Sequence, residues 1–133
     1  MIEKVYEYLK GKLYWLATEE GDQARVRPFG SLAIYEGKLY IATQKGKKVY
    51  QQMLTNPKIE LGAMGQGGGW IRVEAEAVEE NDPAAQKALW AAAAARRKLD
   101  PEKVDPNSAQ FYLKNATVTI NKTGGEAPEI FHF

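Results

Sequence analysis

Short segments of alternating polar and apolar residues, joined by very short connections, limit the folds open to this chain. Lys58–Met64 and Trp70–Val78 both alternate, and only the glycine-rich stretch 65–69 separates them. A period of two places the apolar residues of each segment on one face of a strand. Because so short a connection joins antiparallel neighbours, we expect a sheet that closes as a barrel or stacks as a sandwich.

The whole chain, residues 1–133, is expected to form a single domain of about six strands and three helices. The other strands are predicted at 13–18, 24–35, 38–43 and 110–122, with 129–133 as a candidate for a last short strand, and the helices at 2–10, 47–54 and 83–98. The apolar phase shifts between Leu113 and Ala116, which predicts a bulge near Asn115. The sequence therefore predicts an α+β fold with a mostly antiparallel sheet.

Composition excludes several kinds of functional site. The chain has no cysteine and one histidine, His132, so we expect neither a thiol nucleophile nor a metal site. The 18 Lys and Arg residues nearly balance the 17 Asp and Glu residues, whereas nucleic-acid-binding proteins usually show a basic excess. If the chain is an enzyme, a cofactor is expected to supply the chemistry.

The composition also bears on location. No apolar run is long enough to cross a membrane, and the N-terminus is too charged for a signal peptide. The absence of cysteine fits a reducing compartment, so we expect a cytoplasmic protein without a membrane partner.

Two lysines at the start of a predicted helix break a local electrostatic rule. The N-terminus of a helix carries partial positive charge, so Lys47 and Lys48 cost about 0.3 kcal/mol or more there. A helix start surrounded by cations is well suited to hold an anion, most often a phosphate. The alternative is a set of solvated surface lysines.

The hairpin that precedes this helix predicts a partner for the lysines. A two-residue turn at Glu36-Gly37 pairs Tyr35 with Lys38. If that pairing continues along 24–35, Arg27 arrives beside the helix start and can bind a phosphate in a bidentate way. Thr43 can then add a hydroxyl from the end of the strand.

The order of these segments resembles the pyridoxamine 5′-phosphate oxidase-like flavoproteins, in particular their short bacterial members. The matching pieces are LATEEGDQARVRPFG (16–30), KLYIATQKGKKVYQQMLTNPKIEL (38–61), GGWIRVEAEAV (68–78) and FYLKNATVTI (111–120). The resemblance covers nearly the whole chain. It implies an FMN-binding split barrel of the mostly antiparallel α+β type, in which FMN lies at the interface of a homodimer.

The resemblance also implies roles for particular residues. The FMN phosphate is expected at Arg27, Lys47 and Lys48, the flavin ring along the backbone of Pro28 and Phe29, and strand-end contacts at Ala42 and Thr43. Trp70 falls where a side chain approaches the flavin, often across the dimer interface. The implied activity is that of an oxidoreductase acting on a small molecule, with catalytic residues that the sequence does not identify.

Departures from the family pattern leave alternatives open. Gly46 stands where a hydroxyl residue is common, and the C-terminal EIFHF lacks the substrate-binding arginine of the true oxidase, so pyridoxamine phosphate is not the expected substrate. One alternative is a non-catalytic member that binds flavin or haem. A second is a single-strand nucleic-acid binder that uses Arg25, Arg27 and Phe29. A third is a redesigned chain, with the alanine run 91–95, that keeps the fold without the activity.

Overall fold

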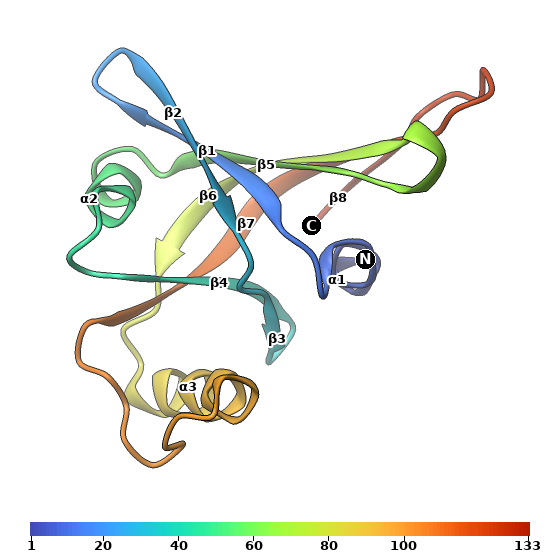
Figure 1. The fold of residues 1–133 in the computed structure, drawn as a ribbon. Coiled ribbons are helices and arrows are strands. Elements are labelled where there is room, and N and C mark those ends of the chain that lie inside the picture. Colours follow the sequence, from blue (N-terminus) through green and yellow to red (C-terminus); the bar gives the residue numbers. More distant parts are fainter.

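Eight strands form one sheet in the computed structural model, which describes residues 1–133 (Figure 1). The strands are β1 (Tyr14–Glu20), β2 (Gln23–Phe29), β3 (Ala33–Tyr35), β4 (Lys38–Gln44), β5 (Lys58–Met64), β6 (Trp70–Glu79), β7 (Ser108–Asn121) and β8 (Glu129–His132). Their order is β2-β1-β5-β6-β7-β4-β3, with β8 paired to β7, and every pair is antiparallel.

Three α-helices accompany the sheet: α1 (Ile2–Leu9), α2 (Lys48–Thr55) and α3 (Pro83–Arg97). A short 3₁₀ turn, η1 (Gln66–Gly68), joins β5 to β6. The predicted α+β fold with three helices is confirmed, and Asp82 caps α3 by accepting the amide N–H of Ala84 at 3.3 Å. No helix is long and apolar enough to serve as a membrane span.

The segment 24–35, predicted as one strand, forms two strands in the structure. This division is a main reason why about six strands were predicted and eight are present. β2 pairs with β1 and β3 pairs with β4, so the two pieces lie at opposite ends of the strand order. Ser31 lies between the two strands, and its side chain bonds to β4 there: its Oγ accepts the N–H of Ala42 at 2.8 Å and donates to the Ala42 carbonyl at 3.1 Å. A side chain here takes the place of a backbone partner.

The hairpin register is therefore correct only near the turn. Tyr35 pairs with Lys38 as predicted. The predicted continuation, which brought Arg27 beside the helix start at Gly46 by pairing with the strand that precedes it, is wrong, because Arg27 pairs with Leu16 on β1.

The predicted bulge in β7 is confirmed at Asn115. The β6–β7 register shifts between Glu74 and Glu76, and Asn115 has a φ of 52°. Its Nδ2 donates to Glu76 Oε2 at 2.8 Å. The bulge bends β7, whose first half pairs with β4 and whose second half pairs with β8.

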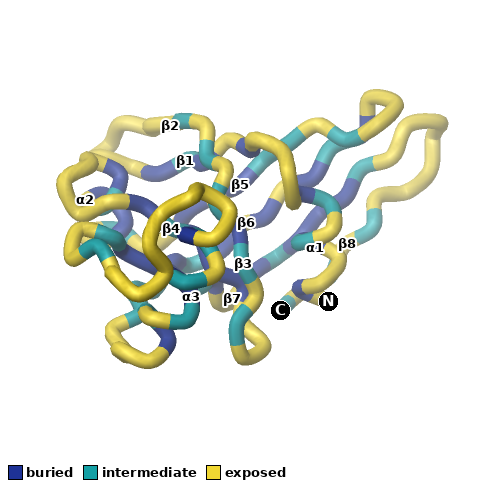
Figure 2. Tube along the Cα trace, turned by 60° about the horizontal axis from the view of Figure 1, so that its bottom comes forward, coloured by how far each residue is buried: buried dark blue, intermediate teal, exposed yellow.

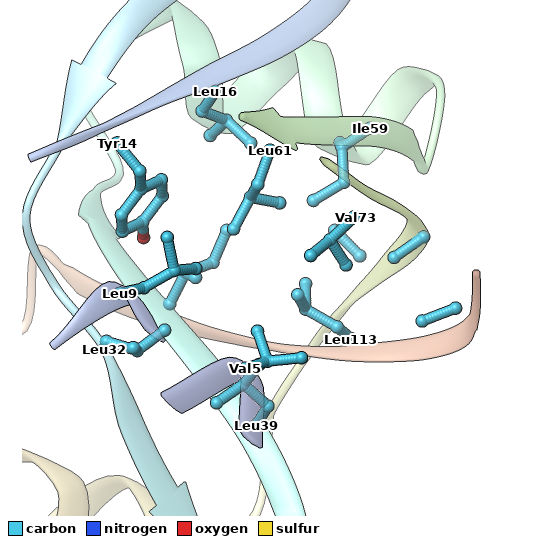
Figure 3. Close-up of a cluster of buried hydrophobic side chains, with 14 of the residues drawn as sticks. Val5, Leu9, Tyr14, Leu16, Leu32, Leu39, Ile59, Leu61, Val73 and Leu113 are labelled. Carbon is cyan, nitrogen blue, oxygen red and sulfur yellow. The ribbon is translucent and has the colours of Figure 1, made fainter. Parts of the chain in front are cut away.

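The core lies between α1 and the inward faces of the strands (Figure 3). Val5 and Leu9 of α1 meet Leu16, Leu61 and other inward side chains, all fully or nearly fully buried. The buried residues concentrate in the central strands, while the hairpin tips and the 98–107 loop are exposed (Figure 2).

Two connecting loops meet at one end of this sheet. Gln44 at the end of β4 pairs with Ser108 at the start of β7, and the Lys45 N–H donates to the Asn107 carbonyl at 2.7 Å. The loop that leads into α2 and the loop that follows α3 therefore lie side by side (Figure 1).

Candidate functional site

A pocket of about 390 Å³ opens where β4 ends. We call it the Thr43 pocket. It is bordered by Gly30–Ser31, Ala42–Gln44, Lys47 and the C-terminal half of α3. Its volume falls within the range of about 300–1,000 Å³ that is usual for small-molecule sites. Three of the predicted cofactor residues, Ala42, Thr43 and Lys47, share this pocket.

The hydroxyl of Thr43 has no hydrogen-bond partner. Thr43 keeps only 9% of its surface exposed, and its Oγ1 is the one buried side-chain polar atom left unsatisfied. Leaving such a group unpaired costs about 1–3 kcal/mol. No group of the chain supplies a partner for this hydroxyl, and Thr43 is among the residues that line the pocket.

Arg27 is a half-buried cation without a carboxylate. Its Nη1 donates to the Leu16 carbonyl at 3.1 Å and to Thr18 Oγ1 at 2.8 Å, and its Nη2 donates to Gln52 Oε1 at 2.7 Å. All three acceptors are neutral, and burial lowers the pKa of the guanidinium. Its positive charge is therefore uncompensated within the chain.

Lys48 lies close to Arg27 by way of α2. Lys48 and Gln52 are four residues apart on the helix, so they share a face, and Gln52 is the residue that Arg27 contacts. Lys48 and Gln52 line a cleft of about 290 Å³ on the β1–β2 side of α2, which we call the Lys48 cleft. Lys47 lines both this cleft and the Thr43 pocket, so the start of α2 lies between them.

The first turn of α2 offers unpaired positive charge. No side chain caps the helix, its first turn contains no acid, and neither Lys47 nor Lys48 forms an ion pair. The Lys48 cleft also contains Glu19 and Glu20, and Glu20 is paired with Arg25 at 3.0 Å. The cleft is thus of mixed charge, whereas three of the four charged residues that line the Thr43 pocket are basic.

Two arginines that the sequence analysis did not select add to the Thr43 pocket. Arg96 and Arg97 in the last turn of α3 line it together with Lys47, against a single acid, Asp105. Their signal in the sequence is a basic pair at a helix end, which is also the usual complement to the helix dipole. The sequence alone does not reveal that this helix end faces the strand end of β4.

The remaining predicted residues are not part of this pocket. Phe29 is half-buried with its ring 6.2 Å from Tyr14, and Pro28 is exposed opposite Trp15. Both lead directly into Gly30 at the pocket edge. Trp70 lines a separate hollow on the outer face of the sheet, so within one chain it does not meet Thr43.

An unsatisfied hydroxyl, a half-buried guanidinium and a lysine-rich helix start all fit a phosphate-bearing ligand such as FMN. The fold itself is that of a split β-barrel, in which the strands wrap around one core. The barrel is split because β2 and β3, at the two ends of the strand order, do not pair with each other, and Ser31 lies in the segment that connects them.

The chain belongs to the pyridoxamine 5′-phosphate oxidase-like family, as its sequence indicated: the family model described as pyridoxamine 5′-phosphate oxidase matches residues 2–121. It is 36% identical to a NimC/NimA family protein from Clostridium acetobutylicum, with a TM-score of 0.86 over 97% of this chain and 90% of that chain.

Two more distant structures share the fold. A pyridoxamine 5′-phosphate oxidase-related, FMN-binding protein from Nostoc punctiforme is 14% identical, with a TM-score of 0.67 over 99% of this chain and 90% of that one. A FAD-binding protein from Mesorhizobium loti is 20% identical, with a TM-score of 0.59 over 92% and 96%. No curated protein matches the chain.

Proposed function

We propose that this chain binds FMN in the Thr43 pocket and acts as an FMN-dependent oxidoreductase on a small molecule. The observation that carries the proposal is the buried, unpartnered Thr43 hydroxyl in a pocket that Lys47 also lines. Membership of a family that includes FMN-dependent oxidoreductases supports it. The cysteine-free composition supports a cytoplasmic location.

Each group of residues has a distinct part in this proposal. Lys47, Lys48 and the free N–H groups at the start of α2 hold the phosphate by charge-assisted hydrogen bonds. Arg27 adds a buried positive charge beneath α2 and fixes Gln52. The Thr43 hydroxyl donates to the ligand, and the backbone at Gly30 and Ser31 borders the flavin ring. The flavin, when bound, supplies the hydride or electron transfer.

We further propose that the active form is a homodimer with FMN between the subunits. Trp15, Val26 and Ile130 are 56–62% exposed on the outer face of the sheet, an unusual number of large apolar side chains for a solvated surface. Trp70 is on the same face. A second subunit that covers this face would bury these side chains and bring Trp70 to the interface.

Nucleic-acid binding is less compatible with the arrangement of the arginines. Arg25 is paired with Glu20, and Arg27 is half-buried under α2, so neither forms an open basic stripe. We therefore propose a small molecule rather than an oligonucleotide as the ligand.

Mutation of the phosphate residues tests the assignment. Arg27→Ala and Lys48→Ala are each expected to weaken FMN binding at least tenfold, about 1.4 kcal/mol. Lys87→Ala, at an exposed position of α3 outside the pocket, is the matched control and is expected to leave the affinity unchanged. Unchanged affinity in both Arg27→Ala and Lys48→Ala would place the phosphate elsewhere.

A separate measurement distinguishes an enzyme from a flavin-binding module. A nicotinamide donor added anaerobically to the FMN-loaded protein is expected to bleach the flavin absorbance, and a small-molecule acceptor to restore it. A bound flavin that no donor reduces would favour the binding module.

A further inference from the structure

Gln52 is a polar side chain on the face of α2 that is buried against the sheet. Only 6% of its surface is exposed, and its buried neighbours on the helix are Val49 and Met53. A buried amide is unfavourable unless its polar atoms are hydrogen-bonded. An apolar residue would therefore pack this face of α2 more favourably if packing were the only requirement, so the contacts of the amide need a separate explanation.

The amide of Gln52 joins three polar side chains of β1 and β2. Its Oε1 accepts from Thr18 Oγ1 at 2.6 Å and from Arg27 Nη2 at 2.7 Å. Its Nε2 donates to Glu20 Oε2 at 3.3 Å. One side chain of α2 is thus bonded to a guanidinium at one end and to a carboxylate at the other.

The neighbouring donors and acceptors fix the orientation of this amide. A guanidinium can only donate, and the Thr18 hydroxyl already accepts from Arg27 Nη1 at 2.8 Å, so its own proton is directed to Gln52. Two donors therefore meet Oε1. The Nε2 group must then face Glu20, whose ionised carboxylate can only accept.

The oriented amide keeps two opposite charges apart. Thr18 and Glu20 follow each other on one face of β1, so the Glu20 carboxylate is next to the group that Arg27 contacts. Hydrogen bonds from Gln52 and Arg25 lower the pKa of Glu20, and Glu20 is paired with Arg25 at 3.0 Å. It forms no ion pair with Arg27. Gln52 occupies the position from which Glu20 would otherwise neutralise Arg27.

We propose that Gln52 is a positioning residue for the ligand phosphate: it holds Arg27 beneath the start of α2 and prevents Glu20 from neutralising it. This inference rests on the proposed function, in which Arg27 and Lys48 attract the FMN phosphate. Lys48 is one helical turn before Gln52 on the same face of α2, so the amide also fixes Arg27 relative to the first turn of the helix. A neutral amide orients the guanidinium and leaves its charge available.

A double-variant cycle tests whether Gln52 acts through Arg27. FMN and riboflavin dissociation constants are measured for the wild type, Gln52→Met, Arg27→Ala and the double variant. Gln52→Met removes the amide and keeps a side chain of similar length. It is expected to raise the FMN constant at least about fivefold and to change the riboflavin constant by less than about twofold, because riboflavin has no phosphate. In the Arg27→Ala background the same substitution is expected to change the FMN constant by less than about twofold.

A charge variant tests the need for a neutral residue. Gln52→Glu places a carboxylate beside Arg27 and is expected to raise the FMN constant at least about tenfold, with the riboflavin constant again within about twofold. Gln51→Glu is the matched control, because Gln51 is exposed, lines the same cleft and does not contact Arg27. It adds the same charge and is expected to change the FMN constant by less than about threefold.

The outcomes separate this role from the site itself and from loss of folding. A wild type that binds FMN no more tightly than riboflavin would overturn the phosphate site and the role of Gln52 with it. A wild type that prefers FMN would overturn the role of Gln52 alone if Gln52→Met weakened both ligands equally, or weakened FMN as much without Arg27. The thermal unfolding transition of each variant checks folding. If Gln52→Met does not fold, the comparison of Gln52→Glu with Gln51→Glu decides, and equal FMN constants in those two variants would overturn the role.

Discussion

Thr43 links stability and ligand binding at a single atom. Its hydroxyl is buried without a partner, so removing it relieves an unfavourable term in the free protein. Thr43→Val is expected to raise the free energy of unfolding without ligand by about 1 kcal/mol and to weaken FMN binding by a similar amount. Chemical denaturation and FMN titration of the same variant measure the two effects.

Thr18 provides the matched control for this prediction. Its hydroxyl donates to Gln52 Oε1 at 2.6 Å and accepts from Arg27 at 2.8 Å. Thr18→Val is therefore expected to destabilise the protein by about 1–2 kcal/mol, the opposite sign. Equal loss of stability in Thr18→Val and Thr43→Val would show that the Thr43 hydroxyl has a partner after all.

At the residue scale, the sequence was sufficient to select the charged residues but not to predict which groups their side chains contact. Lys47 and Lys48 were selected because cations break the usual rule at a helix start, and the structure leaves both without an ion pair. Arg27 approaches α2 from beneath, through Gln52, rather than alongside Gly46. Its partners depend on which strand β2 joins, and that is a long-range property.

Among the elements, β7 depends on a single residue in the left-handed region. Asn115 has a φ of 52°, which a side chain with Cβ adopts only at a cost of about 1–2 kcal/mol unless local hydrogen bonds offset it. Asn115→Ala loses the bond to Glu76 and is expected to lower the free energy of unfolding by about 1–2 kcal/mol. The denaturation midpoint measures this change.

The glycine variant is the control for backbone strain. Asn115→Gly also loses the bond to Glu76 but fits the left-handed conformation, so it is expected to be more stable than Asn115→Ala. An alanine variant as stable as the glycine variant would mean that the bulge moves or disappears when Asn115 is replaced.

Local signals were sufficient to predict most elements and insufficient for one. The Glu36-Gly37 turn, the Asp82-Pro83 helix start and the phase shift near Asn115 each act within a few residues, and all three appear in the structure. The division of 24–35 into β2 and β3 has no such signal, because Ser31 acts by bonding to Ala42 on another strand.

For the whole molecule, the exposed apolar side chains on the outer face of the sheet, which include Trp15, Val26 and Ile130, predict association. Trp15→Glu places a charge on this face and is expected to convert the proposed dimer to a monomer at micromolar concentration, as measured by light scattering after gel filtration. Leu54→Glu is the control, because Leu54 is 46% exposed but lies on α2, away from this face. Dissociation by both substitutions would indicate a general effect of added charge.

At the same scale, the positions of distant residues could not be predicted from periodicity. The outer hollow with Trp70 and the Thr43 pocket share no residue, and only the order of the strands decides that. The arginines of α3 reach the Thr43 pocket for the same reason. The family resemblance was sufficient to predict the fold, whereas the residues that line each pocket became known only from the structure.

The most direct test is equilibrium titration of the purified, flavin-free protein with FMN and with riboflavin, in which quenching of the flavin fluorescence reports binding. The two ligands share the ring and differ in the phosphate, which is the group that Lys47, Lys48 and Arg27 are proposed to bind. We expect saturable FMN binding at least about tenfold tighter than riboflavin binding, a difference that shrinks in Lys48→Ala. Absence of FMN binding, or equal affinity for the two ligands, would contradict a phosphate-anchored flavin site.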